Sequence, residues 1–316
     1  MSEGFLGKTD ATLIHVYGTD RSGSTMLDVM LGNAPDAFSC GEVSAWFRPY
    51  RNHHFQIDCL CAQTPCTVWE KFKNVHEEDF HAAVVKELTV KYVIDSSKDI
   101  CWLIDSQKWA SRSGLKTVNL LIWKDPIELA YSYWKRGKKV NSWRKSFVSC
   151  YGRLIRTGLS FLSIRYSDLA VDPSHSLEKL CNALGMLYFE GKERFWEKQH
   201  HHLFGSEGIR LQIIAGDSRI EIKKVYPEEF VKCRNDLEKQ LAQDREVQYI
   251  IRVLRNANAL LETEKWNPDG NNITSRFLPF WYYRKNLIRL IRRYIPESTE
   301  HPAVKNVETI PLDHSG

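Results

Sequence analysis

The sequence predicts a three-layer α/β fold, in which helices flank a central parallel sheet, with a helical C-terminal extension. Short apolar runs rich in strand-forming residues alternate with stretches whose apolar residues recur at helical spacing. The apolar runs lack a polar face, which is typical of strands covered on both sides in a parallel sheet. A chain of 316 residues without an internal repeat is long enough to build such a sheet as one enlarged domain.

The composition of the chain excludes some classes of protein and of partner. Hydrophobic residues make up 43% of the chain and aromatic residues 12%, which excludes general disorder. The net charge of +5 suits anionic ligands but is too small to indicate nucleic acid, so no nucleic-acid partner is predicted. The chain opens without a signal-peptide pattern and contains no run near ~20 apolar residues, so we expect a cytoplasmic protein.

The first predicted unit is a strand, a glycine loop and a helix. Residues 12–17 read as a strand, and residues 24–31 carry apolar side chains at helical spacing and end at Gly32. The loop between them, Gly18-x4-Gly23-x-Thr25, has the spacing of a Walker A loop, but Ser24 replaces its lysine. A P-loop-like fold is therefore predicted. A helix N-terminus in this setting binds phosphate through backbone N–H groups.

The loop offers donors of its own for that phosphate. Arg21 is its cation, and Ser22, Ser24 and Thr25 add hydroxyl groups. Without the lysine that contacts the β- and γ-phosphates, the loop is predicted to bind a nucleotide phosphate without γ-phosphate chemistry.

Further strands and helices alternate along the chain. Strands are predicted at residues 38–40, 92–94, 118–123 and 161–166. Pro126 suits the first turn of a helix, and Gly185 ends another. Residues 46–66 lack periodicity and read as a loop. The predicted helices are 68–88 (one or two helices), 100–110, one beginning at 126, 142–159, 172–184, 227–240 and 244–262.

A composition change marks a boundary near the C-terminus. The Asn/Pro/Gly-rich segment 266–272 reads as a linker, so the α/β domain is predicted at 1–265 and a linker with a basic tail at 266–316. Residues 280–295 combine aromatic, aliphatic and basic side chains. They suit an amphipathic helix that contacts an anionic membrane or covers an acceptor cleft, or equally a terminal helix packed on its own domain.

Charged side chains follow several predicted strands. Lys98 follows strand 92–94, Lys124 follows strand 118–123, and Glu42 follows strand 38–40. In a parallel sheet the carboxyl ends of the strands share one edge, where ligands bind. Together with Arg21, these cations predict a site for a nucleotide that carries two phosphate centres.

Three cysteines invite a zinc interpretation. Cys59, Cys61 and Cys66 lie close in sequence, with His53 and His54 nearby. Their spacing fits no common zinc finger and lacks a second CxxC pair, so a loop of thiols, able to form a disulfide, is favoured and no metal ligand is predicted.

The motifs occur in an order that resembles the sulfotransferase superfamily over roughly residues 12–212. Arg21-Ser-Gly-Ser-Thr25 is similar to the loop that binds the 5′-phosphosulfate, and Leu121 through Ser132 is similar to the 3′-phosphate segment. Further matches are Cys40-Gly-Glu42, Asp95-Ser-Ser-Lys98, Arg165-Tyr-Ser-Asp168-Leu, and His201-His-Leu-Phe-Gly205 with Arg210. The set resembles a bacterial-type member with features of protein-tyrosine sulfotransferases.

The resemblance implies an activity and roles for residues. The donor, a co-substrate, would be 3′-phosphoadenosine 5′-phosphosulfate, no metal would be required, and the acceptor would be a small-molecule or glycan hydroxyl (carbohydrate, lipid, or phenol/tyrosine). Glu42 would be the general base and Lys98 would stabilise the leaving phosphate. Two residues depart from the family pattern, Lys124 for arginine and Ser24 for threonine. The donor-binding residues would be Arg21, Ser22, Gly23, Ser24, Thr25, Lys124, Ser132 and Arg210.

The same residues fit other functions. One alternative is a P-loop small-molecule kinase, in which Asp95 would be the carboxylate that binds Mg²⁺. Another is an inert nucleotide-binding scaffold, which would contact a membrane through the tail segment 280–295. Glu42 could instead be structural, paired with Arg21 or Arg48. The base would then be sought among His53, His54 and residues 200–202.

Overall fold

The computed structural model describes residues 10–217 and 226–259, and five parallel strands form its sheet in the order β2-β3-β1-β4-β5. In β1, for example, Ile14 lies beside Ile94 of β3 and Val118 of β4. The three-layer α/β prediction with a parallel sheet is confirmed. The strands are β1 (Thr12–Tyr17), β2 (Ala37–Gly41), β3 (Tyr92–Asp95), β4 (Lys116–Trp123) and β5 (Leu162–Arg165).

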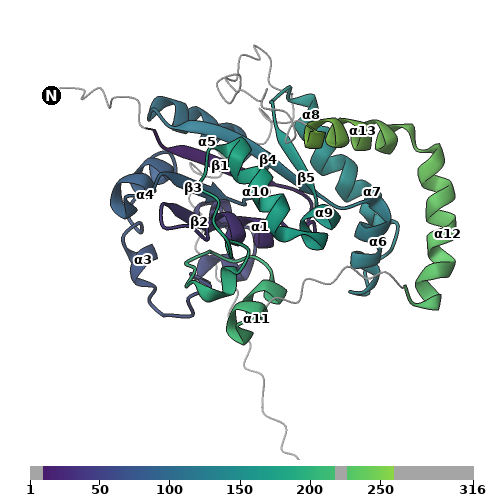
Figure 1. The fold of residues 1–316 in the computed structure, drawn as a ribbon, viewed down its shortest axis with the longest axis horizontal. Coiled ribbons are helices and arrows are strands. Elements are labelled where there is room, and N and C mark those ends of the chain that lie inside the picture. Colours follow the sequence, from purple (N-terminus) through teal and green to yellow (C-terminus); the bar gives the residue numbers. More distant parts are fainter. Residues whose placement is uncertain (1–9, 218–225, 260–316) are drawn as a thin grey trace, which may run out of the picture. The chain divides into compact units, whose positions relative to one another are not determined.

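Helices and short helical turns connect the strands, and Figure 1 labels the helices. The helices are α1 (Ser24–Leu31), α2 (Val43–Phe47), α3 (Thr67–Glu70), α4 (Phe80–Leu88), α5 (Ile100–Arg112), α6 (Pro126–Trp134), α7 (Ser142–Phe147), α8 (Arg153–Arg156), α9 (Tyr166–Val171), α10 (Pro173–Leu184), α11 (Glu207–Ala215), α12 (Glu228–Gln243) and α13 (Arg245–Ala259). The turns are η1 (Asn52–Phe55), η2 (Val148–Gly152) and η3 (Phe195–Glu197).

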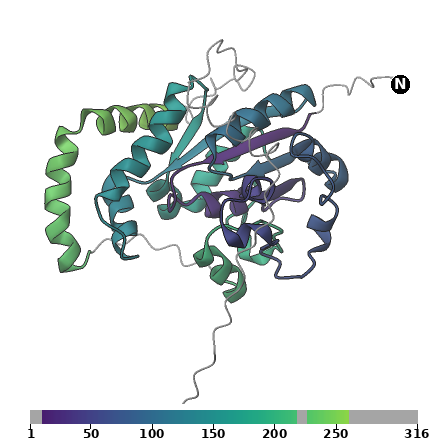
Figure 2. The same ribbon diagram turned by 180° about the vertical axis from the view of Figure 1, so that it is seen from behind.

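Side chains alternate along the strands between two apolar cores, because successive residues of a strand point to opposite faces. Ile14 and Ile94 join the core that α1 and α10 cover. Leu13 and Val93 join the core that α4 and α5 cover. Beyond the β5 edge, both views show α6, α7, α12 and α13 on the side opposite α3 and α4 (Figures 1 and 2).

The helix predictions agree with the structure at one segment and differ from it at others. Segment 68–88, predicted as one or two helices, is two short helices, α3 and α4, separated by turns around residues 71–79. Segment 142–159 begins as α7, passes through the π-helical turn η2 and ends as α8. Helices α2, α9 and α11 were not predicted. Helices α2 and α9 have five and six residues, too few for periodicity to show. Helix α11 has nine residues, but its apolar residues do not gather on one clear face.

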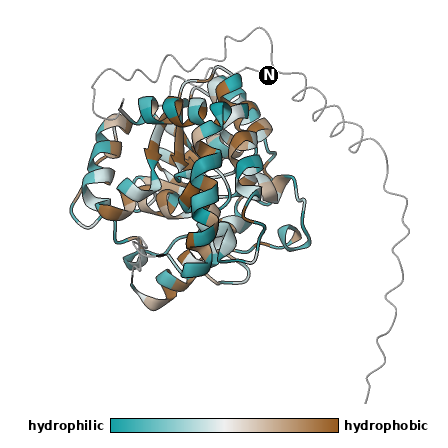
Figure 3. Cartoon of the chain, turned by 90° about the vertical axis from the view of Figure 1, so that its right-hand side faces the viewer, coloured by the Kyte–Doolittle hydropathy of each residue, from teal (hydrophilic) through white to brown (hydrophobic). Residues whose placement is uncertain are grey.

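Hydropathy follows burial at the end of the sheet beyond β5. Seen from that side, the strands are hydrophobic and the helix in front turns a mainly hydrophilic surface outward (Figure 3). In α12, only Phe230 and Leu237 are buried. Among the described residues, no helix combines the length and the hydropathy that crossing a bilayer requires. The predicted boundary at 265/266 and the tail segment 280–295 lie outside the described residues.

Candidate active site at the carboxyl edge of the sheet

A cavity of about 410 Å³ lies where β1, β2, β3 and β4 end. Each of these strands delivers a charged or polar side chain to it. Basic groups outnumber acidic ones, six against two: Arg21, Arg51, Lys98, Lys124, Arg136 and Lys138 against Asp20 and Glu42. The remaining lining residues are Gly23, Ser24, Thr25, Met26, Tyr50, His53, His54, Tyr166, Phe204, Gly205, Ser206, Gly208, Ile209 and Gln212.

The loop between β1 and α1 forms one wall of this cavity. Gly23 precedes α1 with φ 103°, and a Cβ there would lie 2.6 Å from the Tyr166 ring, so the position requires glycine. No side chain caps α1 and its first turn carries no acidic residue. The N–H groups of a first helical turn have no partner within the helix. An anion in the cavity would supply that partner and would favour the positive end of the helix dipole.

Arg21 adds a cation to the loop. Its backbone adopts the left-handed region (φ 72°), and its Nε is buried without a hydrogen-bond partner among the described residues. Burial lowers the pKa of Arg21, and the nearby charge of Arg136 lowers it further. An anionic ligand would relieve both effects, because it would pair with the guanidinium groups.

Glu42 and Lys98 form an ion pair inside the cavity. Glu42 follows β2, where its N–H donates to the Leu203 carbonyl (3.1 Å). Gly41 before it has φ 76°, and a Cβ there would lie 2.2 Å from the Leu203 carbonyl oxygen. Burial disfavours the Lys98 charge, but the Glu42 carboxylate more than offsets it, so the pKa of Lys98 is raised. The cation and the carboxylate therefore meet at the same edge.

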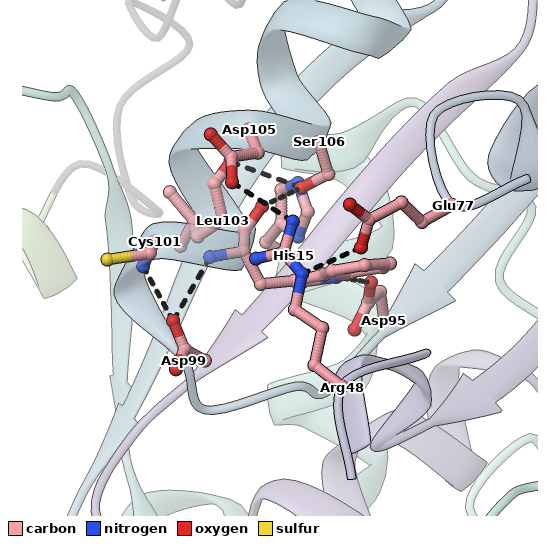
Figure 4. Close-up of polar contacts among 10 residues, drawn as sticks. His15, Arg48, Glu77, Asp95, Asp99, Cys101, Leu103, Asp105 and Ser106 are labelled. Atoms are coloured by element: carbon pink, nitrogen blue, oxygen red, sulfur yellow. Dashed lines mark hydrogen bonds and ion pairs between the residues drawn. The ribbon is translucent and has the colours of Figure 1, made fainter. Parts of the chain in front are cut away.

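Arg48 is already paired elsewhere, which removes one structural explanation for Glu42. Its guanidinium lies between Glu77 (2.7 Å) and Asp105 (3.0 Å), as Figure 4 shows. It also lies over the Trp102 ring, 4.9 Å from the centroid. Both carboxylate partners of Arg48 come from outside the cavity lining, and Glu42 is left to Lys98.

Asp95, the last residue of β3, is fully buried (Figure 4). Its Oδ2 accepts from the Trp102 indole N–H (2.7 Å) and lies 2.9 Å from His81 Nε2, while Oδ1 accepts from the Ser97 N–H (2.8 Å). Burial opposes its charge, but the hydrogen bond and the charge of His81, the charge of His15 and the hydrogen bond from Ser97 lower the pKa of Asp95 to about 2. Asp95 thus holds the β3 end in place and is not among the residues that line the cavity.

Lys124 follows β4 and lies over the Tyr166 ring, with its Nζ 3.9 Å from the centroid. Burial lowers its pKa to about 8; the Glu128 charge opposes that shift, whereas Arg21 adds to it. The amine is therefore only partly protonated near pH 8. A phosphate beside it would favour the charged form.

Most of the predicted site residues meet in the cavity. Glu42, Lys98, Arg21, Gly23, Ser24, Thr25 and Lys124 line it, whereas Ser22, Ser132 and Arg210 are not among the lining residues. Ser22 is a fully buried residue of the loop, and Ser132 is half-buried on α6. Arg210, on α11, forms an ion pair with Asp58 and donates to the Cys59 carbonyl (3.3 Å).

Several lining residues were not predicted. Arg136 and Lys138 come just after α6 and line the cavity. The only sequence feature that could have indicated them is the cluster of basic residues that follows Lys124. Tyr50 and Arg51 lie in the segment read as a loop. Tyr166 belongs to a predicted strand end but was given no role, although its ring packs against both the glycine loop and Lys124.

The histidines considered as alternative bases separate into two groups. His53 and His54 line the cavity. His200 is buried against the Phe195 carbonyl (2.8 Å), and the His202 Nδ1 lies 2.7 Å from the Ser39 hydroxyl. His201 points its Nδ1 at the Cys66 sulfur (3.3 Å). Of the described histidines, only His53 and His54 are thus placed to receive a proton from a ligand in this cavity.

Buried histidines make stability depend on pH. Burial lowers the pKa of His15 to about 4, of His200 to about 4 and of His202 to about 3. Between pH 6.5 and these lowered pKa values, the unfolded chain binds more protons than the folded chain. The free energy of unfolding should therefore fall as pH falls, by about 1.4 kcal/mol for each unit by which the folded and unfolded pKa values of a histidine differ. Asp28 has the opposite effect. Burial raises its pKa to about 7, so between pH 7 and 3.8 the folded chain holds a proton there that the unfolded chain has released, which stabilises the folded state as pH falls.

Urea unfolding at pH 7.5, 6 and 5 measures the balance. Three histidines against one carboxyl predict a net loss of stability. His200→Gln should flatten the slope, while the same change at the exposed His76 should leave it unchanged. A free energy of unfolding that stays constant or rises on acidification would contradict the prediction.

The chain matches no protein-family model and no curated protein. Among solved structures it is similar to a sulfotransferase domain from the curacin biosynthetic pathway, with 14% identity, a TM-score of 0.48, and coverage of 72% of this chain and 98% of that one. It is also similar to the sulfotransferase domain of the Synechococcus PCC 7002 olefin synthase, with 16% identity, a TM-score of 0.47, and coverage of 73% and 96%.

Proposed function

We propose that the protein is a sulfotransferase that moves the sulfonate of 3′-phosphoadenosine 5′-phosphosulfate to a hydroxyl acceptor. One observation carries the proposal. The Glu42–Lys98 pair, a carboxylate and a cation, shares a cavity with a phosphate-type loop and with Lys124. A base, a cation for the leaving group and cations for the nucleotide are thus held together. The ordered sequence motifs that resemble the superfamily support the same activity.

The chemistry assigns a role to each group. The acceptor oxygen forms a bond to sulfur while the bond from sulfur to the bridging oxygen breaks, and the electron pair remains on the nucleotide phosphate. Lys98 stabilises the charge that develops on that oxygen, as positioned cations do in phosphoryl transfer. Glu42 accepts the acceptor's proton. Ser24, Thr25 and the first N–H groups of α1 hold the 5′-phosphate.

The 3′-phosphate falls to Lys124 in this proposal. Lysine supplies charge but not the bidentate geometry of an arginine. Arg136 and Lys138 line the same cavity and provide further positive charge. The role expected for Ser132 stays a prediction, since the serine is not among the lining residues.

A kinase would need a carboxylate free for Mg²⁺. Asp95 is buried and its oxygens already accept hydrogen bonds from Trp102 and Ser97. Glu42 is paired with Lys98. Asp20 is the remaining carboxylate that lines the cavity. The absence of the Walker lysine, where Ser24 stands, favours sulfonate transfer over a magnesium-dependent kinase, and activity with EDTA present would agree with it. No observation favours the inert scaffold.

Nucleotide binding tests the proposal without an acceptor. In calorimetry without Mg²⁺, 3′-phosphoadenosine 5′-phosphate should bind much more tightly than AMP, because the extra phosphate meets Lys124. Lys124→Ala should weaken its binding by about 1.5–3 kcal/mol, the range for a charge-assisted hydrogen bond. Affinity in the wild type should also decline above pH 8, as the Lys124 amine loses its proton.

The matched control is Lys116→Ala, which removes an exposed lysine paired with Asp10 outside the cavity. It should leave both affinities unchanged. Equal affinities of the wild type for the two nucleotides would remove the role given to Lys124 and, with it, the proposed donor.

A further inference from the structure

Three cysteines and one histidine gather close together, on segments whose neighbouring residues line the cavity. The Sγ atoms of Cys59, Cys61 and Cys66 and a ring nitrogen of His201 all lie within 4.8 Å of one another. The His201 Nδ1 lies 3.3 Å from the Cys66 sulfur and 4.0 Å from the Cys59 sulfur. Cys59 and Cys66 are buried, and the other two residues are half-buried. No metal ligand was predicted here, because the cysteine spacing fits no common zinc finger and lacks a second CxxC pair; His201, far along the chain, supplies the fourth group.

We propose that Cys59, Cys61, Cys66 and His201 bind one zinc ion. Zinc prefers four ligands in a tetrahedron, at about 2.3 Å from sulfur and 2.0–2.1 Å from nitrogen. Those bond lengths place sulfur atoms about 3.8 Å from each other and about 3.6 Å from the nitrogen. The measured separations, 3.3 and 4.0 Å for two pairs and at most 4.8 Å for the rest, lie on both sides of these values. Small movements of the four side chains would therefore bring them to the distances that a bound zinc ion requires.

The backbone already holds the two ligand segments together. The Leu60 N–H donates to the His202 carbonyl (3.0 Å), and the Phe204 N–H donates to the Asp58 carbonyl (2.8 Å). The Trp69 indole N–H donates to the His201 carbonyl (2.6 Å). The Ala62 N–H closes a tight turn onto the Cys59 carbonyl (3.1 Å). These bonds fix the orientation of the ligands before any metal arrives.

The ligand set indicates a structural ion. Four protein ligands complete the tetrahedron, and a catalytic zinc would keep one position for water or substrate. A disulfide would use only two of the three sulfurs and would leave His201 beside a lone thiol, which does not account for the convergence of all four groups. The cysteines are unpaired in the structure.

The ion would join two walls of the active-site cavity. His53 and His54 come shortly before Cys59, and Phe204 and Gly205 come shortly after His201; all four residues line the cavity. Binding at a folded site stabilises the folded state, because the unfolded chain does not hold the ligands together. Zinc would thus fasten segment 53–66 to segment 201–205. This proposal does not depend on the reaction assigned to the cavity.

Metal analysis of the purified full-length protein tests the proposal directly. We expect about one zinc ion per chain, the stoichiometry of a closed structural site. Cys66→Ser and His201→Asn should lose the metal, while Cys233→Ser on α12 and the exposed His76→Asn should keep it. Chelation should lower the thermal midpoint of the wild type and of both controls.

A measurement on the wild type keeps the test decisive if the variants do not fold. X-ray absorption of the zinc protein should show three sulfur ligands at about 2.3 Å and one nitrogen at about 2.0–2.1 Å. Replacement by Co²⁺ should give the absorption bands of a tetrahedral thiolate site. A protein without bound zinc that takes up no Co²⁺ would overturn the proposal, as would a disulfide between two of these cysteines or a ligand set with fewer sulfurs.

Discussion

Replacement of Glu42 by glutamine is expected to lower turnover of a hydroxyl acceptor by about 10²–10⁴-fold, the contribution of a positioned general base. Glutamine keeps the volume and the hydrogen bonding but cannot take a proton. Donor affinity should not fall, because the Glu42 carboxylate competes with anions for Lys98 in the free protein. The loss should therefore appear in kcat at saturating donor, with calorimetry of the nucleotide as the companion measurement.

A surface ion pair provides the control for this variant. Glu70 pairs with Lys73 across one helical turn, with both side chains at least 40% exposed, whereas Glu42 and Lys98 are 21% and 18% exposed. Glu70→Gln should leave turnover unchanged. If Glu42→Gln unfolds the protein or abolishes nucleotide binding, the glutamate is structural, and His53 and His54 become the bases to test. Full activity of the variant would show that the mechanism is wrong.

Replacement of Lys98 by alanine is expected to raise the barrier by about 3 kcal/mol, the effect of removing one preorganised group that stabilises developing charge. Turnover should fall by two to three orders of magnitude. Unlike Glu42→Gln, this variant should also bind the donor more weakly, because Lys98 already meets the phosphosulfate in the ground state. Steady-state kinetics with both substrates separates the two effects.

Lys98→Arg distinguishes charge from geometry. It keeps the cation but changes its shape, so it should restore donor affinity better than turnover. The control Lys73→Ala removes an exposed lysine and should have no effect on either quantity. Unchanged turnover in Lys98→Ala would exclude the lysine from the transition state and leave Arg21, in the glycine loop of the same cavity, as the cation to test.

Much of the fold could be predicted because the strands are buried on both faces. Continuous apolar runs such as residues 118–123 leave little doubt about a central strand, and the parallel order then follows from the intervening helices. Helix interruptions were harder to predict. The π-helical turn η2 keeps nearly the same apolar pattern as the helix around it, so periodicity does not reveal it.

The positions of the site residues that closely follow a strand could be predicted from the sequence. Glu42, Lys98 and Lys124 reach one cavity because their strands end at one edge. Their pairing was not predictable, since it depends on side-chain direction and on which partner Arg48 takes. Arg210 pairs with Asp58, a contact that nothing in the local sequence shows, and its role in donor binding stays a prediction. The position of His201 likewise depends on a contact between distant segments.

Leu203 is bound to the end of β2, and this contact covers part of an edge of the sheet at which another chain could pair. β2 is an outer strand of the sheet, and its last residues pair with Leu203 through the Cys40 carbonyl and the Glu42 N–H. Unpaired backbone groups on an outer strand are templates for pairing with another chain. Because synthesis must pass residue 203 before this border is covered, the nascent protein exposes it while most of the sheet is already made.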